Sequence, residues 1–458
     1  MPGIHFPKHS VSKSSFSHSL ITGTLLLTFA GVLTRIIGFF YRIFLSRVIG
    51  AEGIGIYQLT APVMALGFAI TSAGIQTSIS RFVSTEVGKK NPNGARRYLF
   101  AGLALSLLLS AVFSLILWKY AAFIATVWLG DARCAPLLSV LSLSFVPSCI
   151  HACINGYYYG LKKTGVPALT QLAEQFARVA AVYALFLIYS EQQSAVPLSI
   201  TMWGIVIGEI ASTLVSISCI RLLPDAGSSK PSWSSCTKNL LLMAAPLTAN
   251  RVVLNLFSSY ENIMIPNRLR LFGYDTSDAL GVYGILTGMA MSVVMFPSVI
   301  TNSVSVLLLP AISEAKAAGD DALIRRTLKK TIESCLSLGF LATVAFLFTG
   351  DFLGNFLFGN ALAGTFITTL GWICPFLYLG STLSSILHGL GFPGLTFVLN
   401  LVSYGIRILF VLFAVPVFGI KSYLWGILLS QAVLALLAIL LLLRMTRSSR
   451  RCRERKVK

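Results

Sequence analysis

The sequence predicts an all-α polytopic membrane protein in which about twelve transmembrane helices form two six-helix lobes. Three observations predict this fold: a high hydrophobic content, long apolar runs along the whole chain, and short motifs that return in the second half. Hydrophobic residues make up 55% of the 458 residues, whereas charged residues make up 11%. A soluble chain carries about 25% charged residues, so this chain has too little polar surface for a water-soluble particle of its size.

The apolar runs are about 20 residues or longer, which is the length that an α-helix needs to cross a bilayer. They are preceded by a polar, serine-rich and mildly basic segment with no sign of a cleavable signal peptide. The predicted spans are 21–47, 57–82, 97–119, 135–160, 166–189, 197–221, 240–266, 279–309, 327–349, 362–388, 394–416 and 421–444. We divide the chain into an N-terminal tail (1–20), an N-lobe (21–222), a polar linker (223–239), a C-lobe (240–444) and a basic tail (445–458).

Four motif pairs recur in the same order in the two halves, which indicates a duplicated six-helix unit. The pairs are RVIG (47–50) with RLFG (270–273), GIY (55–57) with GVY (281–283), STEVGKKNPNGARR (84–97) with ISEAKAAGDDALIRR (312–326), and GVPALT (165–170) with GFPGLT (391–396). Because six is even, both copies enter the membrane in the same direction. The halves are therefore predicted to be parallel repeats about an axis along the membrane normal. Gly and Pro in the last pair suit helix ends, so we assign that motif no chemistry.

The formal net charge of +20 is concentrated in segments predicted to lie on the same side as both termini. Examples are the loop at 84–97, the segment at 325–330 and the tail RMTRSSRRCRERKVK at 444–458. By the positive-inside rule, both termini are predicted to be cytoplasmic. The basic tail would then contact anionic membrane lipid, and no nucleic-acid partner is needed to explain the charge.

Eight ionisable residues fall well inside the predicted spans. They are Arg35, Arg42, Arg178, Arg251, Arg407, Glu174, Glu209 and Glu261. A charged side chain facing lipid at the bilayer centre costs at least about 2.5 kcal/mol, so each is expected to face a partner or an aqueous cavity.

Two equivalent spans carry arginine-bearing polar stripes with the spacing of one helical face. The stripe in the first span is Thr28, Gly31, Arg35, Gly38 and Arg42, and that in the seventh is Arg251, Asn255, Ser258 and Asn262. A central cavity with more arginines than carboxylates suits an anionic substrate, since guanidinium binds phosphate through two hydrogen bonds and stays charged. The predicted substrate-binding residues are Arg35, Arg251, Arg178, Arg42 and Asn255.

Simpler roles are open for several of these residues. Glu174 and Arg178 are four positions apart and would neutralise each other, and Arg42 lies near a helix end, from which it would reach the membrane surface. Glu209 is either a structural partner of an arginine or a proton or cation site, and we take it as the candidate ion-coupling residue. In Cys149-Ile-His151-Ala-Cys153 the histidine points away from both cysteines on a helix, so we expect packing and no metal site.

The segments LLLTFAGVLTRIIGFFYRIFLSRVIGAEGIGIYQLTAPV (25–63) and SAGIQTSISRFVSTEVGKKN (72–91) resemble the stage V sporulation protein B family. They are also similar to lipid II flippases in the superfamily of multidrug, oligosaccharidyl-lipid and polysaccharide exporters. The resemblance covers about residues 20–445. It implies the fold of multidrug and toxin extrusion-like exporters, a bacterial cytoplasmic membrane location, and alternating access by the two lobes.

In lipid II flippases the first helix carries cavity arginines in an R-x-x-G-F context, which Arg35-Ile-Ile-Gly38-Phe39 matches. Arg42 follows Arg35 by one position more than in that branch, and flippases of that branch commonly have fourteen helices where twelve are predicted here. The resemblance implies transport of undecaprenyl-pyrophosphate-linked cell-wall, spore-cortex or polysaccharide precursors.

The leading hypothesis is a flippase for a lipid-linked anionic glycan, driven by the membrane potential or a monovalent cation and using no cofactor. One alternative is a cation-coupled multidrug exporter of the same fold, and another is a non-transporting membrane scaffold in envelope or spore assembly. The sequence contains no Gly-rich phosphate loop or nucleophile elbow, so we expect a transporter and not an enzyme.

Overall fold

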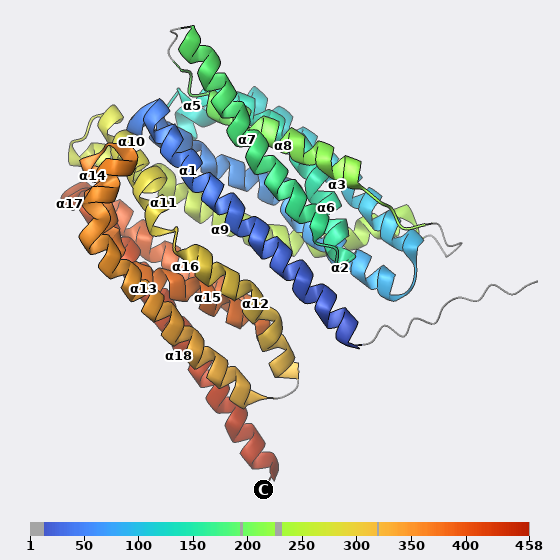
Figure 1. Cartoon of the computed structure of the whole chain (residues 1–458). Helices are drawn as coiled ribbons and strands as arrows, with labels where there is room; N and C mark the ends of the chain where they lie inside the picture. Colours follow the sequence, from blue (N-terminus) through green and yellow to red (C-terminus); the bar gives the residue numbers. More distant parts are fainter. Residues whose placement is uncertain (1–12, 193–195, 225–230, 318–319, 458) are drawn as a thin grey trace, which may run out of the picture.

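The computed structural model describes residues 13–192, 196–224, 231–317 and 320–457, and every regular element in these ranges is a helix (Figure 1). Ten helical segments are long and apolar enough to cross a membrane, or eleven if the bent pair α14 (Ala361–Gly371) and α15 (Cys374–Gly389) forms one span. The predicted all-α polytopic class is therefore confirmed.

The first six predicted spans correspond to α1 through α8. The helix α1 (Lys13–Phe68) changes direction at Gly50, where φ is 69°, and continues through a π-helical turn into α2 (Gly74–Gly88). This continuous stretch covers the first two predicted spans, and its turn falls at a glycine because only glycine adopts positive φ without strain. The remaining helices are α3 (Pro92–Lys119), α4 (Ala121–Phe123), α5 (Cys134–Leu141), α6 (Phe145–Gly160), α7 (Gly165–Glu191) and α8 (Ile200–Cys219).

The second six predicted spans begin with α9 (Trp233–Phe272) and α10 (Thr276–Gly284). The others are α11 (Met291–Val294), α12 (Ser298–Ala317), α13 (Asp321–Phe358), α14, α15, α16 (Pro393–Leu409), α17 (Val415–Phe418) and α18 (Ile420–Val457). The eighth predicted span, 279–309, is interrupted between α11 and α12. Pro297 lies in this break; it has no backbone N–H to donate and disfavours helical geometry at the preceding residue.

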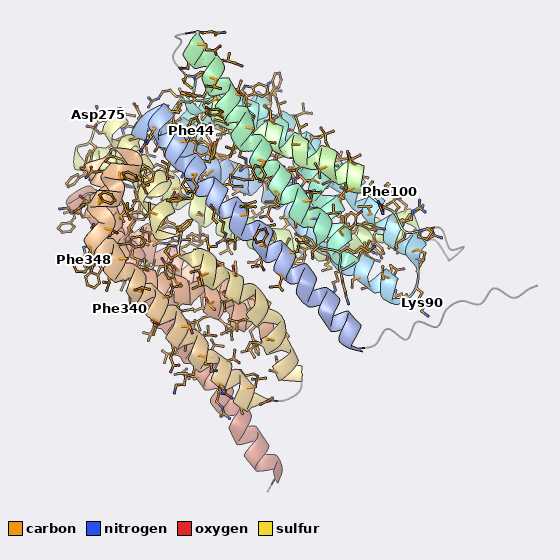
Figure 2. All side chains as sticks on the ribbon, viewed as in Figure 1. Phe44, Lys90, Phe100, Asp275, Phe340 and Phe348 are labelled. Carbon is orange, nitrogen blue, oxygen red and sulfur yellow. The ribbon has the colours of Figure 1, made fainter. Side chains whose placement is uncertain are left out.

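Lys90 and Asp275 mark the two opposite ends of the helix bundle in Figure 2. We call the end with Lys90 the basic end; the start of α1 and the end of α18 also lie on this side (Figure 1). The opposite end, with Asp275 and the turn at Gly50, is the distal end. In Figure 1 the blue-to-green helices and the yellow-to-red helices approach each other at the distal end and separate toward the basic end.

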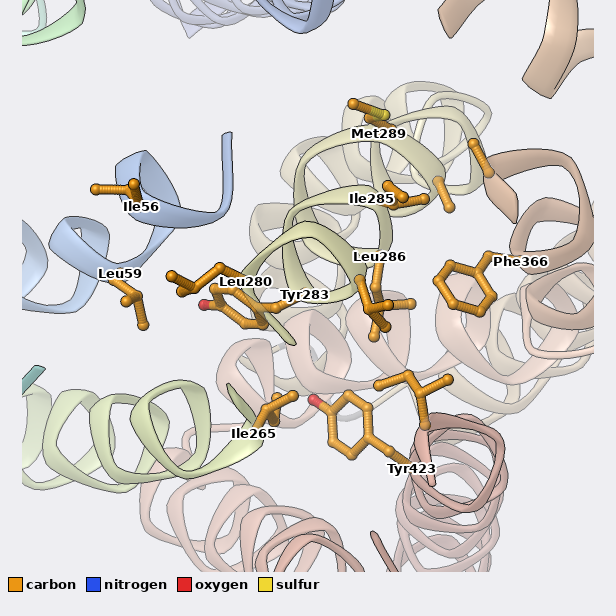
Figure 3. Close-up of a cluster of buried hydrophobic side chains, with 14 of the residues drawn as sticks. Ile56, Leu59, Ile265, Leu280, Tyr283, Ile285, Leu286, Met289, Phe366 and Tyr423 are labelled. Atoms are coloured by element: carbon orange, nitrogen blue, oxygen red, sulfur yellow. The ribbon is translucent and has the colours of Figure 1, made fainter. Parts of the chain in front are cut away.

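The duplicated GIY and GVY motifs meet each other where the lobes touch at the distal end. A Cβ on Gly55 would overlap the backbone carbonyl of Leu280, and a Cβ on Gly284 would overlap the backbone of Ala51 and Gly55. The surrounding core contains residues of both lobes, among them Ile56, Leu59, Leu280, Tyr283 and Leu286 (Figure 3). Close backbone approach at small residues is how helices associate in lipid, where burial alone gives little driving force.

The α9 helix connects the two lobes. It begins at Trp233, inside the segment predicted to be linker, and its first turns pack on the N-lobe. Cys236, Leu240 and Ala244 share a buried cluster with Ile79 and Tyr98 of α2 and α3. The predicted span at 240–266 leaves out the start of this helix because its first seven residues, WSSCTKN, are polar. The Ser232 side chain caps the helix by accepting from the backbone N–H of Ser235 at 3.2 Å.

An ion-pair network holds the turn of α1 to the loop before α5. Arg133 contacts Glu52 of α1 and Asp131, with nitrogen–oxygen distances of 2.7 Å to each. Burial opposes ionisation of Asp131, but its hydrogen bonds from Arg133 outweigh burial and lower the pKa of the Asp131 carboxyl below its usual value.

Candidate functional site

Arg35 lies in a cavity between the lobes. The cavity has a volume of about 250 Å³ and is bounded by α1, α6 and α7 on one side and by α12 on the other. Its polar lining includes Thr28, Gln171, Asn302 and Ser303. The Arg35 side chain is exposed and, among the residues that the structure describes, has no hydrogen bond or ion pair. Its guanidinium is therefore available to a ligand in this cavity.

Arg251 lies in a second cavity between the lobes. This cavity is about 350 Å³ in volume and is lined by Arg251, Leu254 and Asn255 of α9 together with residues 65–73 of the N-lobe. Asn255 donates to the backbone oxygen of Ala65 at 3.1 Å, so it joins the two lobes directly. The exposed Arg251 guanidinium is, like that of Arg35, without a hydrogen bond or ion pair in the described part of the chain.

Two further arginines of α1 connect the lobes toward the distal end. Nη1 of Arg42 donates to Oγ of Ser292 in α11 at 2.8 Å. Arg47 donates to the carbonyl oxygens of Phe356 at 2.8 Å and Leu357 at 3.1 Å. These carbonyls lie at the C-terminus of α13, where the helix leaves acceptors unpaired and carries partial negative charge. The structure thus places Arg42 at an interlobe contact and away from the two cavities.

Arg178 forms an ion pair with Glu174 one turn earlier on α7. The side chains of both residues are 22% exposed. The sequence left open whether these residues neutralise each other, and in the structure they are paired. An anionic ligand would have to compete with Glu174 for the Arg178 guanidinium.

Glu209 is buried in α8 and contacts His151 of α6 at 2.7 Å between carboxylate oxygen and Nε2. A chain of hydrogen bonds leads to this pair: Thr170 donates to Oδ1 of Asn155 at 3.2 Å, and Nδ2 of Asn155 lies 3.5 Å from Nδ1 of His151. These contacts hold the His151 imidazole against the Glu209 carboxylate. We call His151, Glu174 and Glu209 the N-lobe cluster.

The expectation that His151 serves only packing is corrected by this contact with Glu209. His151 and Glu209 are 58 positions apart and meet because α6 and α8 pack together, so no local sequence pattern signals the pair. The two cysteines of the same motif are separate from it: the thiol of Cys149 donates to the backbone oxygen of Val146, and Cys153 is buried in another cluster.

The C-lobe has its own buried charge pair. Glu261 of α9 accepts a hydrogen bond from the Tyr423 hydroxyl at 2.7 Å and contacts Nη1 of Arg407 at 3.3 Å. The Arg407 guanidinium stacks over the Tyr404 ring at 4.6 Å and lines a cavity of about 240 Å³ within the lobe. One carboxylate and one guanidinium balance in charge, so Glu261 is compensated in place by Arg407.

Substitution of either member of this C-lobe pair is expected to destabilise the protein strongly. Arg407→Met would leave the Glu261 carboxylate buried and unpaired, which costs about 3–5 kcal/mol of unfolding free energy. The double variant Glu261→Gln, Arg407→Met should recover most of the loss because no buried charge remains. Thermal unfolding of the purified protein in detergent measures both variants. Equal losses in the single and double variants would contradict the pairing.

Comparison with protein-family models identifies the family of the chain. A family model described as polysaccharide biosynthesis protein matches residues 20–316, which is more than half of the chain and includes both interlobe cavities and the N-lobe cluster. The chain belongs to the polysaccharide biosynthesis protein family. Membership in this family agrees with the resemblance that the first two spans show. The apolar helices make the chain a multi-pass membrane protein.

Two proteins of Bacillus subtilis are similar to this chain over most of its length. Stage V sporulation protein B of Bacillus subtilis (strain 168) is 28% identical over 431 residues, which cover 92% of this chain and 82% of that protein. The lipid II flippase MurJ of the same organism is 23% identical over 342 residues, or 70% of this chain and 63% of the flippase.

Solved structures of transporters share the fold of this chain. A multidrug resistance MATE family transporter in its inward-facing conformation superposes with a TM-score of 0.74 at 14% identity, over 91% of this chain and 96% of that one. A transporter of the MOP superfamily from Pyrococcus furiosus, described as having a binding pocket of reverse polarity, superposes with a TM-score of 0.68 at 13% identity, over 94% and 96% of the two chains. The predicted multidrug and toxin extrusion-like fold is therefore confirmed.

Proposed function

We propose that this chain is a flippase that moves undecaprenyl-pyrophosphate-linked cell-wall or polysaccharide precursors across the bacterial cytoplasmic membrane by alternating access. The observation that carries the proposal is that Arg35 and Arg251 lie in two cavities between the lobes and have no hydrogen-bond or ion-pair partner among the described residues. An arginine that faces an interlobe cavity in this way is suited to a pyrophosphate group. The names of the sporulation and flippase relatives support a role in peptidoglycan or spore-cortex synthesis.

The direction of entry follows from the two ends of the molecule. The basic end carries the start of α1 and the end of α18 and would be cytoplasmic by the positive-inside rule. The lobes are in contact at the distal end, so the pyrophosphate head group would enter from the basic end while the polyprenyl chain stays in lipid. Rocking of the lobes would then open the distal end to the outside.

The other residues predicted from the sequence also have roles in this proposal. Arg178 would bind the head group when released from Glu174, and Arg42 and Asn255 would act through the interlobe contacts they make. Glu209 would be the ion-coupling residue, and the membrane potential or a cation at this residue would bias the cycle. The chain acts as a transporter in this scheme, and its partners are the lipid-linked glycan and membrane lipids.

The test is transbilayer movement of labelled undecaprenyl-pyrophosphoryl sugar in proteoliposomes that contain the wild-type chain. We expect movement of this lipid above protein-free vesicles, and no increase for a labelled zwitterionic phospholipid measured in parallel. Efflux of a cationic dye without precursor movement would favour the multidrug exporter alternative. If neither probe moves, a scaffold role is favoured and the flippase proposal is rejected for these lipids.

A further inference from the structure

The N-lobe cluster brings metal-ligating atoms from three helices to one place. One nitrogen of His151 and one carboxylate oxygen each of Glu174 and Glu209 all lie within 4.8 Å of one another. Within the described ranges, no other group of three or more His, Cys, Asp or Glu side chains comes together in this way. The side chains of His151, Glu174 and Glu209 are 14%, 22% and 5% exposed, respectively, so the cluster is largely enclosed but is accessible to a small ion.

The cluster has more carboxylates than guanidinium groups. Glu174 lies beside the Arg178 guanidinium, whereas Glu209 is in contact only with the imidazole of His151. The C-lobe pair of Glu261 and Arg407 has no such excess. A carboxylate inside a membrane helix bundle is costly without a positive charge beside it, so the N-lobe cluster can accept a cation at the carboxylate that has no guanidinium partner.

The type of ligand atom selects the type of cation. Hard cations such as Mg²⁺ and Ca²⁺ prefer sites made of oxygen alone, whereas an imidazole nitrogen favours first-row transition ions and Zn²⁺. We propose that the N-lobe cluster binds one divalent ion of this class, with Nε2 of His151 and one carboxylate oxygen each of Glu174 and Glu209 as ligands. The imidazole nitrogen thus changes the expected ion from a monovalent to a divalent cation.

The neighbouring side chains suit such a site. Metal binding at Nε2 moves the imidazole proton to Nδ1, and a ligating histidine usually donates that second N–H to a nearby acceptor. Asn155 lies 3.5 Å from Nδ1. Rotation of its amide by half a turn would present the carbonyl oxygen to this N–H, and the Thr170 hydroxyl can turn to accept from the amide nitrogen.

The site also links the cation to the arginine that pairs with it. A dication that shares the Glu174 carboxylate weakens the hold of that carboxylate on Arg178. Because linkage is reciprocal, an anion bound at Arg178 would in turn strengthen cation binding. This last step rests on the proposed function, whereas the metal site itself does not.

The test is Co²⁺ binding to the purified full-length chain after removal of metal with EDTA, read by visible absorption and by competition with Zn²⁺. We expect saturation at one Co²⁺ per chain, with a spectrum that shows nitrogen ligation. His151→Gln and Glu209→Gln should lower the Co²⁺ affinity by at least about 10- to 100-fold, since even loss of an outer-shell partner has this effect. His388→Gln removes an exposed histidine of α15 and should leave the affinity unchanged.

Unfolding temperatures of the metal-free proteins show whether the variants are folded, and the glutamine side chains retain the capacity to hydrogen-bond. The proposal is overturned if the wild type shows no saturable binding. It is also overturned if the affinity is unchanged in His151→Gln and Glu209→Gln, because the metal then lies elsewhere on the chain. No lipid substrate enters this assay, so its failure would leave the proposed transport function intact.

Discussion

Alanine substitution of Arg35 or Arg251 is expected to abolish most transbilayer movement of the lipid-linked precursor while the protein stays folded. Each side chain is exposed in a cavity and has no ion-pair partner in the part of the chain that the structure describes, so its removal breaks no ion pair of the kind seen at Arg407. A hydrogen bond to a charged group contributes about 1.5–3 kcal/mol. At 1.4 kcal/mol per tenfold, loss of one such bond corresponds to a decrease in the transport rate of about 10- to 100-fold.

A conservative variant and a control variant test this prediction further. Arg35→Lys keeps the positive charge but loses the planar fork that binds phosphate through two hydrogen bonds, so an intermediate rate is expected. Arg270→Ala removes an exposed arginine from the distal end of the same helix as Arg251 and should leave the rate unchanged. Wild-type rates in both cavity variants would show that the pyrophosphate binds elsewhere.

The variant Gly55→Ala is expected to force the distal ends of the lobes apart. The added Cβ would overlap the carbonyl of Leu280, which is backbone and cannot move without α10. Overpacking of this kind costs about 1–3 kcal/mol. Such a cost would shift the equilibrium between closed and open distal ends by about 5- to 150-fold. The distance between spin labels at Lys119 and Asp278, two exposed positions in opposite lobes, should increase, and transport should slow.

Gly281→Ala is the matched control, since it makes the same change in α10 where no atom lies within 4 Å of the added Cβ. It should leave the label distance unchanged and stabilise the helix by about 0.5–1 kcal/mol. If Gly55→Ala leaves the label distance at its wild-type value, the close packing at Gly55 does not control closure of the distal end.

Much of the fold follows from one-dimensional patterns in the sequence. The predicted spans have helical counterparts because apolar length determines where a helix can cross lipid. The boundaries fail where polarity and helix formation diverge, as in the polar first turn of α9 at Trp233, and at Pro297, which interrupts an apolar run that looks continuous.

The candidate site was predictable only in part. Helical spacing placed Arg35 on one face of the first span and Arg251 on the corresponding face of the seventh, and the structure finds both side chains in interlobe cavities. The partners of Glu209 and Arg42 were not predictable because His151 and Ser292 approach them from other helices. Such pairs depend on helix packing, which a single sequence does not encode in any local spacing.

The meeting of GIY with GVY also bears on how such a chain could arise. Segments that are equivalent in the two halves touch each other, which is the arrangement that two identical chains would adopt about a twofold axis. A six-helix unit that pairs with a copy of itself would use a contact of this kind, with close glycine packing at its centre. The two halves nevertheless differ in their buried charges: the C-lobe pairs one carboxylate with one guanidinium, whereas the N-lobe cluster holds two carboxylates, one imidazole and one guanidinium.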